Sequence, residues 1–411
     1  MKAILEKQVN AIWYGHQKPI SGILNYALYF FVQFALYLSW PFFQLGRYYI
    51  SFKSKYKSSF NLEKLNNNIN NNINSRLMII IGNITVGGTG KTPLVLQLAE
   101  QLKKLGYFPG IISKGYLGRK VLASAMPHEI KLEDSPRDWG DEAVLLAHKL
   151  HTSSDPNSDS AVPVIVCKNR LKAIEALVQT HPNINIILSD DGLQDNGFMQ
   201  WVNSLHSAQV LKLCIIDSQR GFGNQKLLPL GPLREPKVRL VNYHHMMIHE
   251  SHSHSHSNAN FNSGASLPAM NNPIFFQSSI IAFYQLNHTN TDLSLSLSLK
   301  LKNLSYKPKQ FARAFHTVRA VTGIGNPDRF FQSLKTLGLS LQEKAYADHV
   351  HYQVSDLIFG DNLPIVMTEK DAIKIKAFAD QIKAPIWVAK LALTGLDPLI
   401  NIIQDKINKI K

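Results

Sequence analysis

A glycine-rich segment that ends in lysine and threonine is the part of this sequence with the clearest chemical prediction. It reads Thr85-Val86-Gly87-Gly88-Thr89-Gly90-Lys91-Thr92. Glycines let backbone N–H groups approach phosphate oxygens, a lysine reaches the β- and γ-phosphates, and a threonine hydroxyl can bind Mg²⁺. We therefore predict that residues 85–92 bind the phosphates of a nucleotide.

The segment departs at one position from the strict pattern Gly-x-x-x-x-Gly-Lys-Ser/Thr. Thr85 stands where the first glycine is expected, and Val86 stands where a deviant form of the pattern has a lysine. An ordinary glycine-rich turn between a strand and a helix is the alternative. The Gly-Lys-Thr core, between a strand-like and a helix-like segment, favours nucleotide binding.

Acidic residues form a second set of candidates. Asp190 and Asp191 follow the hydrophobic segment 184–189, and a carboxylate at the end of a strand downstream of a phosphate loop commonly manages Mg²⁺. Paired carboxylates can also form a simple turn. Asp141 precedes a predicted helix over 143–150, where capping of that helix is the alternative function.

Alternating strand-like and helix-like segments must position these groups. They predict an α/β fold in which a P-loop NTPase-like domain with a parallel sheet covers residues 76–240. A second, smaller α/β domain is expected over 311–411. Residues 241–310 are expected to be an insertion with linking strands.

The N-terminal segment, residues 1–60, predicts a membrane-associated helix. Residues 19–46 carry no charge, and about 20 apolar residues suffice to span a bilayer. Polar and amphipathic aromatic residues recur along one helical face and favour a helix that lies in the interface. A true span and a soluble core helix remain open. The recurring residues are Asn25, Tyr29, Gln33, Tyr37 and Trp40.

Composition limits the possible partners. The 411 residues carry a formal charge of +15, which points to nucleic acid, anionic lipid or a phosphorylated substrate. The lysines are scattered, without an arginine-rich arm or zinc-ligand spacing, so nucleic acid is not expected as a partner. The two cysteines, Cys167 and Cys214, lie in apolar segments and predict buried thiols in place of a disulfide framework.

Several segments together resemble the tetraacyldisaccharide 4′-kinase family, the lipid A kinases of Gram-negative bacteria. The resemblance covers roughly residues 38–376. The segments that carry it are Gly82-Asn83-Ile-Thr85-Val-Gly87-Gly88-Thr-Gly90-Lys91-Thr92-Pro93, Gly140-Asp141-Glu142, Asp190-Asp191-Gly192-Leu193-Gln194, Arg220-Gly-Phe-Gly-Asn224, Leu228-Pro-Leu-Gly-Pro-Leu-Arg234-Glu235, Gly323-Ile-Gly325-Asn-Pro327, Asp348-His349 and Met367-Thr-Glu-Lys-Asp371-Ala372.

The resemblance implies an enzyme that uses ATP and Mg²⁺ to phosphorylate the 4′-hydroxyl of a tetraacylated glucosamine disaccharide 1-phosphate, forming lipid IVA. It implies a peripheral or shallowly inserted protein on the cytoplasmic face of the inner membrane, with an anionic membrane surface as partner. The family also has threonine at the position of Thr85.

The resemblance also assigns roles to residues. Asp141 would be the general base, oriented by His349, and Lys91 would stabilise phosphate charge. Thr92 would bind Mg²⁺ together with Asp190 and Asp191. Further active-site contacts are expected from Lys114, Gln194, Arg234 and Glu235.

Three positions depart from the family pattern. Lys114 stands where the family usually has arginine, Leu117 where it often has glycine, and Asp195 where it commonly has histidine. A lysine keeps the positive charge of an arginine but loses its bidentate fork. We therefore expect Lys114 to bind a phosphate with less geometric definition.

Two other functions remain as alternatives. A soluble P-loop ATPase or GTPase that acts as a switch or assembly factor accounts for Lys91 but leaves Asp141 and His349 without a role. A GTPase would also be expected to contain an Asn-Lys-x-Asp string, and the sequence has none. The other alternative is a membrane-bound nucleotide-binding module without catalysis.

Overall fold

The computed structural model describes residues 9–14, 31–35, 37–39, 41, 73, 75–124, 126–152, 161–250, 273–286 and 305–410. The strands are β1 (Leu77–Gly82), β2 (Pro109–Ser113), β3 (His128–Glu129), β4 (Val164–Val166), β5 (Ile186–Asp190), β6 (Val210–Asp217), β7 (His245–Glu250), β8 (Ile274–Gln285), β9 (Ser305–Tyr306), β10 (Thr317–Thr322), β11 (Ser340–Ala345), β12 (Ile365–Thr368) and β13 (Ile386–Thr394). The helices are α3 (Lys91–Lys104), α4 (Arg119–Ala123), α5 (Pro136–Trp139), α6 (Asp141–Thr152), α7 (Arg170–Thr180), α8 (Asn196–Val202), α10 (Pro308–Ala314), α11 (Pro327–Lys335), α12 (Glu369–Ile375) and α13 (Asp397–Ile410).

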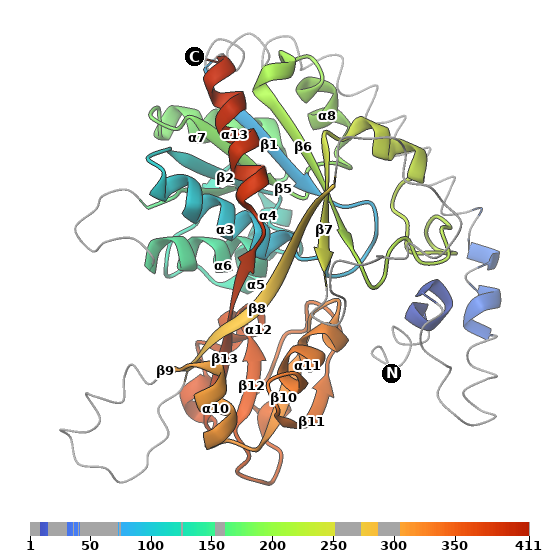
Figure 1. Cartoon of the computed structure of the whole chain (residues 1–411), viewed down its shortest axis with the longest axis vertical. Helices are drawn as coiled ribbons and strands as arrows, with labels where there is room; N and C mark the ends of the chain where they lie inside the picture. Colours follow the sequence, from blue (N-terminus) through green and yellow to red (C-terminus); the bar gives the residue numbers. More distant parts are fainter. Residues whose placement is uncertain are drawn as a thin grey trace.

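One mostly parallel sheet, with 13 strands among the described residues, runs through the molecule (Figure 1). Its order is β11-β10-β12-β13-β8-β7-β6-β1-β5-β2-β4-β3, and β9 pairs with β8. The long strands β8 and β13 pair antiparallel and join two parallel groups of strands. We call residues 75–250 together with α13 the N-terminal lobe, and residues 305–385 the C-terminal lobe. The expected mixed α/β architecture with mostly parallel strands is confirmed.

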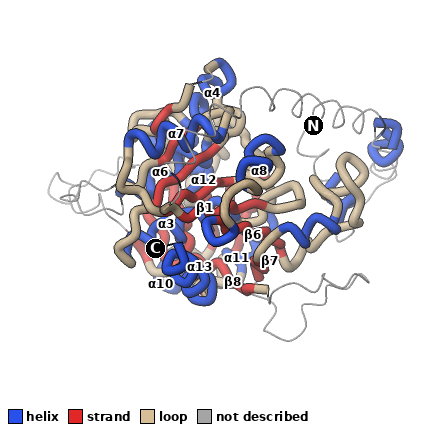
Figure 2. The backbone as a smooth tube through the Cα atoms, turned by 90° about the horizontal axis from the view of Figure 1, so that it is seen from above, coloured by secondary structure: helices blue, strands red, loops and turns tan. Residues whose placement is uncertain are grey.

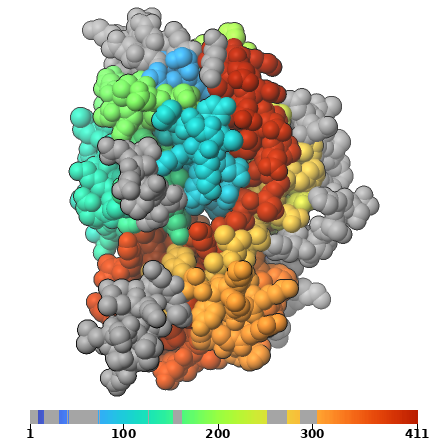
Figure 3. Space-filling view, turned by 60° about the vertical axis from the view of Figure 1, so that its left-hand side comes forward, coloured from blue at the N-terminus to red at the C-terminus, as the bar shows by residue number. Residues whose placement is uncertain are grey.

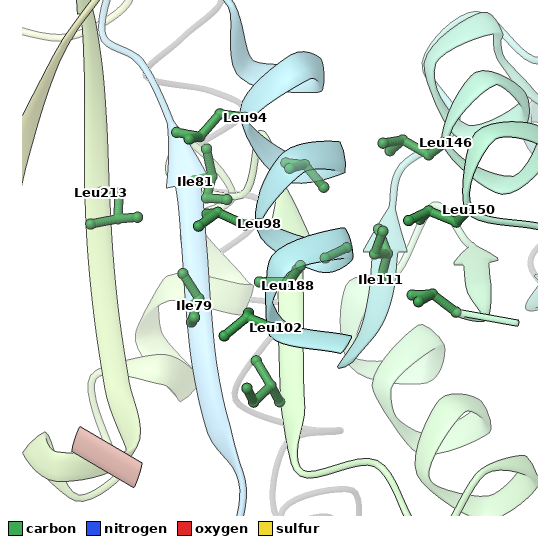
Figure 4. Close-up of a cluster of buried hydrophobic side chains, with 14 of the residues drawn as sticks. Ile79, Ile81, Leu94, Leu98, Leu102, Ile111, Leu146, Leu150, Leu188 and Leu213 are labelled. Carbon is green, nitrogen blue, oxygen red and sulfur yellow. The ribbon is translucent and has the colours of Figure 1, made fainter. Parts of the chain in front are cut away.

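Hydrophobic periodicity explains how the N-terminal lobe holds its central strand. Every residue of β1 is buried, and α3 turns Leu94, Leu98 and Leu102 toward one face of it (Figure 4). These leucines recur every four residues, so they form a stripe along one side of the helix. Helices cover the sheet on both faces (Figure 2). Cys167 and Cys214 are buried thiols in this core and form no disulfide, as expected.

The last helix returns to the N-terminal lobe. Leu399 and Ile403 of α13 belong to the same buried cluster as α3 and β1, and the two helices lie side by side on the surface (Figure 3). The predicted limits 76–240, 241–310 and 311–411 stay predictions. The packing places the final helix with the first lobe although the sequence order groups it with the second.

The predicted membrane segment within residues 1–60 lies mostly outside the described residues. Among the residues that are described, no helix has the length and apolar character needed to cross a bilayer. Residues 9–14 contact the N-terminal lobe: the Trp13 indole donates to the Pro229 carbonyl at 3.0 Å.

Candidate functional site

The glycine segment forms the loop between the carboxyl end of β1 and the start of α3. Gly87 and Gly90 both have φ of 97°, a conformation that favours glycine. Among the described residues, no protein acceptor takes the backbone amides of residues 87–90. A helix N-terminus with free amides is a suitable site for phosphate groups.

The loop is held in place through its carbonyl groups. The Tyr14 hydroxyl donates to the Val86 carbonyl at 3.1 Å, and the His249 ring contacts the Thr89 carbonyl at 3.0 Å through Nδ1. Gly325 of the C-terminal lobe lies so close that a Cβ on it would be 2.6 Å from the Gly88 amide nitrogen. Contacts from three parts of the chain therefore fix the loop.

Replacing Gly90 by alanine is expected to weaken ATP binding by at least tenfold. The new Cβ would lie 2.7 Å from His249 Nδ1, so the loop must shift and move the amides. Gly106→Ala is the matched control, because Gly106 also has a positive φ (83°) but a Cβ added there would meet no atom within 4 Å. Titration calorimetry with ATP compares the two variants. Equal affinities in both would contradict the assignment of the loop.

Lys91 is placed at the first position of α3 and points toward the end of β5. Its Nζ donates to Asn83 Oδ1 at 3.0 Å and lies 3.6 Å from Asp191 Oδ1. Arg234 Nη1 donates to Asp191 Oδ2 at 2.8 Å. Burial alone would raise the pKa of Asp191, but the Lys91 and Arg234 cations outweigh it and lower the pKa to about 2.

The pKa of Asp190 is shifted in the opposite direction from that of Asp191. Burial, together with the neighbouring Glu142 and Asp191 carboxylates, raises its pKa to about 7. Its Oδ1 is buried and accepts no hydrogen bond from the described part of the chain. A carboxylate with these properties suits a cation ligand, because a bound cation would favour its charged form. The described residues include no group of three or more His, Cys, Asp or Glu side chains that could hold a metal ion.

Gln194 and Glu235 lie beside these aspartates. Gln194 Nε2 donates to Glu235 Oε1 at 2.6 Å and to the Asn83 carbonyl at 2.9 Å. Glu235 is buried and also accepts from the Tyr243 hydroxyl at 3.4 Å. Gln194 therefore contacts both Glu235 and Asn83, and the Asn83 side chain accepts a hydrogen bond from Lys91.

Asp141 and His349 meet across the two lobes. Asp141 begins α6, and His349 follows β11 in the C-terminal lobe; His349 Nδ1 lies 3.1 Å from Asp141 Oδ2. Burial alone would raise the pKa of Asp141, but the hydrogen bond with His349 and the nearby lysine charges hold it well below its usual range. The pair expected from the resemblance is thus formed in this structure.

Two lysines of α12 that were not predicted as site residues also reach this pair. Lys370 Nζ lies 2.9 Å from Glu142 Oε1 and 3.7 Å from Asp141 Oδ2. Lys374 Nζ lies 3.6 Å from the same Asp141 oxygen. Because residues 370 and 374 are four apart on a helix, they share one face. The sequence spacing of the two lysines indicates a shared charged face, but it does not identify Asp141 as the residue that they contact.

Lys114 contacts a second residue that departs from the family pattern. Its Nζ pairs with Asp195 Oδ2 at 3.0 Å, and Arg170 Nη1 contacts the same oxygen at 3.1 Å. Lys114 and Asp195 are two of the three positions that depart from the family pattern. The two residues that differ from the family pattern therefore contact each other.

The lobes are also joined near the glycine loop. Asp217, at the end of β6, accepts from Asn326 Nδ2 at 3.1 Å and pairs with Arg329 at 3.1 Å. Both partners belong to the C-terminal lobe. This contact was not predicted, since Asp217 reads in the sequence as the polar end of a strand.

Comparisons with known proteins agree with one another. The family model described as Tetraacyldisaccharide-1-P 4'-kinase (LpxK) matches residues 55–408. A tetraacyldisaccharide 4'-kinase of Pseudomonas fluorescens is 36% identical over 302 residues, 74% of this chain and 74% of that protein. One from Polynucleobacter necessarius is 33% identical over 344 residues, 81% and 83% of the two chains. A crystal structure of LpxK from Aquifex aeolicus in complex with ATP covers 81% of this chain and 89% of its own, with 21% identity and a TM-score of 0.54, and shares the fold.

Proposed function

This chain belongs to the tetraacyldisaccharide 4′-kinase family and is a lipid A 4′-kinase, and we propose that its glycine loop and its Asp141–His349 pair perform the two halves of that reaction. The observation that carries the proposal is the contact between Asp141 and His349 across the lobes. A soluble switch ATPase or GTPase has no use for such a pair and is not favoured. We further propose that the enzyme acts at the cytoplasmic face of the inner membrane, with the lipid A disaccharide precursor as acceptor.

In the proposed reaction Asp141 accepts the proton of the 4′-hydroxyl group. The 4′-oxygen forms a bond to the γ-phosphorus while the bond from that phosphorus to the β–γ bridging oxygen breaks, and ADP leaves with the electron pair. His349 Nδ1 orients the Asp141 carboxylate from the other lobe. The amides of residues 87–90 and the ammonium of Lys91 stabilise the negative charge of the phosphates.

Thr92, Asp190 and Asp191 are the residues that we propose to hold Mg²⁺. Mg²⁺, when bound, neutralises charge on the phosphate oxygens. The buried, unpartnered Oδ1 of Asp190 supports this assignment, as does the position of Thr92 in the first turn of α3. Arg234 holds the neighbouring Asp191 carboxylate through its Nη1 group.

Transfer of labelled phosphate tests the proposal directly. The purified chain is incubated with γ-³²P-ATP and the tetraacyl disaccharide 1-phosphate in mixed detergent micelles, and lipid-bound label is expected. Label released as inorganic phosphate in the absence of any labelled lipid would favour the ATPase alternative. Binding of ATP without either product would favour a module without catalysis.

Removing the charge of Lys370 is expected to move the acid limb of the kcat/KM profile to higher pH. Asp141 acts as a base only when deprotonated, and Lys370 is one of the groups that lower its pKa against the effect of burial. In Lys370→Met that contribution is lost, so protonation inactivates Asp141 at a higher pH. Lys370→Arg keeps the charge and should restore most of the profile.

The control for this profile is Lys335→Met. Lys335 pairs with Glu343 at 2.7 Å on the surface of the C-terminal lobe, where the loss of one charge leaves Asp141 unaffected. Rates are measured across pH at subsaturating lipid. An acid limb that coincides in Lys370→Met and the parent enzyme would refute the proposed influence of Lys370 on Asp141.

A further inference from the structure

The surface near the Asp141–His349 pair exposes several large apolar side chains. The segment that connects β2 to β3 along the chain forms this surface. It includes the short helix α4 and lies at the rim of the N-terminal lobe (Figure 2). Four large apolar side chains within eleven residues are exposed here: Tyr116 (64%), Leu117 (47%), Leu122 (63%) and Met126 (69%). We call these four side chains the rim patch.

The rim patch is carried by backbone that is packed tightly against the turn before Asp141. A Cβ on Gly118 would lie 2.7 Å from the Asp138 carbonyl oxygen, and one on Gly140 would lie 2.9 Å from the Gly115 carbonyl carbon. Val121 of α4 is buried and belongs to the hydrophobic core of the N-terminal lobe. The turn that carries Tyr116 and Leu117 is therefore packed against the turn before Asp141.

The rim patch also borders the catalytic pair directly. The Tyr116 ring centroid lies 5.4 Å from that of His349. A molecule that contacts Tyr116 therefore lies beside His349. In the proposed reaction the acceptor hydroxyl meets Asp141, which His349 contacts at 3.1 Å, so it would lie near the Tyr116 ring.

Positive charge accompanies the apolar groups. Arg119 and Arg137 are exposed and have no acidic partner among the described residues, whereas Lys120 pairs with Asp138 at 3.2 Å. Arg119 and Arg137 both lie near His351, whose pKa is lowered by partial burial and then by these guanidinium groups and Lys374. Apolar side chains flanked by unpaired cations suit an anionic lipid surface.

We propose that the rim patch, with Arg119 and Arg137, rests on an anionic bilayer and so holds the Asp141–His349 pair close to the membrane that contains the acceptor. This inference rests on the proposed function and adds a membrane contact within the folded N-terminal lobe, separate from the segment over residues 1–60. A protein partner fits less well, because a protein seated on Tyr116 would cover the approach to His349. A bilayer would instead present the lipid hydroxyl there.

A local probe tests the contact independently of any other membrane-binding segment. In the full chain, Leu122→Cys is labelled with the environment-sensitive dye NBD; the native thiols Cys167 and Cys214 are buried. With vesicles of phosphatidylcholine containing about 30% phosphatidylglycerol, the emission is expected to shift to the blue and rise several-fold. Labelled Leu105→Cys is the control. Leu105 is 49% exposed and sits at the far end of α3, about 21 Å along the helix from the glycine loop.

A double variant tests the contribution of charge. Arg119→Glu with Arg137→Glu, in the Leu122→Cys background, should reduce the emission change several-fold and raise KM for lipid in vesicles, with KM for ATP unchanged. Emission at position 122 that stays constant while the protein sediments with vesicles would overturn the proposal, as would an equal response to pure phosphatidylcholine. Phosphoryl transfer in micelles is scored separately, so a protein that docks without transferring phosphate would contradict the proposed function alone.

Discussion

Replacing Asp141 by asparagine is expected to lower kcat by about 10²- to 10⁴-fold, the range that a positioned general base contributes. Asparagine has nearly the same shape but cannot take the proton of the acceptor hydroxyl. Affinity for ATP should change little, because the loop that we assign to ATP follows β1, whereas Asp141 begins α6. The measurement is lipid phosphorylation at saturating ATP and lipid, with ATP affinity by calorimetry.

A structural role for Asp141 predicts a different result. Its Oδ1 accepts from the Glu142 amide at 2.9 Å in the first turn of α6, and loss of a helix cap costs about 1 kcal/mol of folding stability. Asparagine keeps that acceptor oxygen, so Asp141→Asn should keep the cap, and any loss of stability comes from the charge interactions with His349, Lys370 and Lys374. A variant with near-normal kcat but reduced stability would show that Asp141 has only a structural role.

A variant of His349 tests whether this residue acts together with Asp141. His349→Ala removes the group that orients Asp141 but leaves the carboxylate in place, so its kcat should fall less than that of Asp141→Asn. The double variant should be no worse than Asp141→Asn alone, because residues that act as one unit are not additive. Fully additive losses would indicate that the two residues act separately.

The donor half of the site could be predicted from sequence because parallel strands bring their carboxyl ends to one edge of a sheet. Ile81 of β1 pairs with Asp190 of β5, so the loop after one strand must lie beside the aspartates that end the other. Hydrophobic runs were enough to locate both strands. The proximity of Lys91 and Asp191 follows from that topology.

The acceptor half could not be derived in this way. Asp141 and His349 are 208 positions apart, and only the resemblance to a family paired them. Lys370 and Glu142 are 228 positions apart. The acidic and basic residues at the start of α12 indicate that Lys370 forms an ion pair, but they do not identify Glu142 as the other member. Contacts between lobes depend on how the lobes are joined, and no local pattern encodes that.

The joining of the lobes was itself the least predictable feature of the fold. Chain length favours two domains, each with its own core, yet β8 and β13 pair antiparallel and continue one sheet through both. The apolar stripe of α13 predicts a buried face but does not say which lobe it covers. Its return to the N-terminal lobe depends on the direction in which β13 leaves the C-terminal lobe.

Lys91→Met is expected to lower kcat by about 10²- to 10³-fold, comparable to the loss of one preorganised donor to a developing negative charge. Asn83 and Asp191 hold the Lys91 ammonium in place at the start of α3. Such a charge needs little reorganisation during transfer, so its removal should affect the transition state more than ATP binding. The assay is lipid phosphorylation at saturating ATP, with ATP affinity determined separately.

Two further variants distinguish positioning from charge. Lys91→Arg keeps the charge, but its planar guanidinium cannot replace a compact ammonium between Asn83 and Asp191, so we expect only partial activity. Lys104→Met removes an exposed lysine from the last turn of the same helix and should leave kcat unchanged. If Lys91→Met lost ATP affinity in proportion to kcat/KM while kcat was retained, Lys91 would bind ground state and transition state equally. The lysine would then be an anchor for ATP and would not assist phosphoryl transfer.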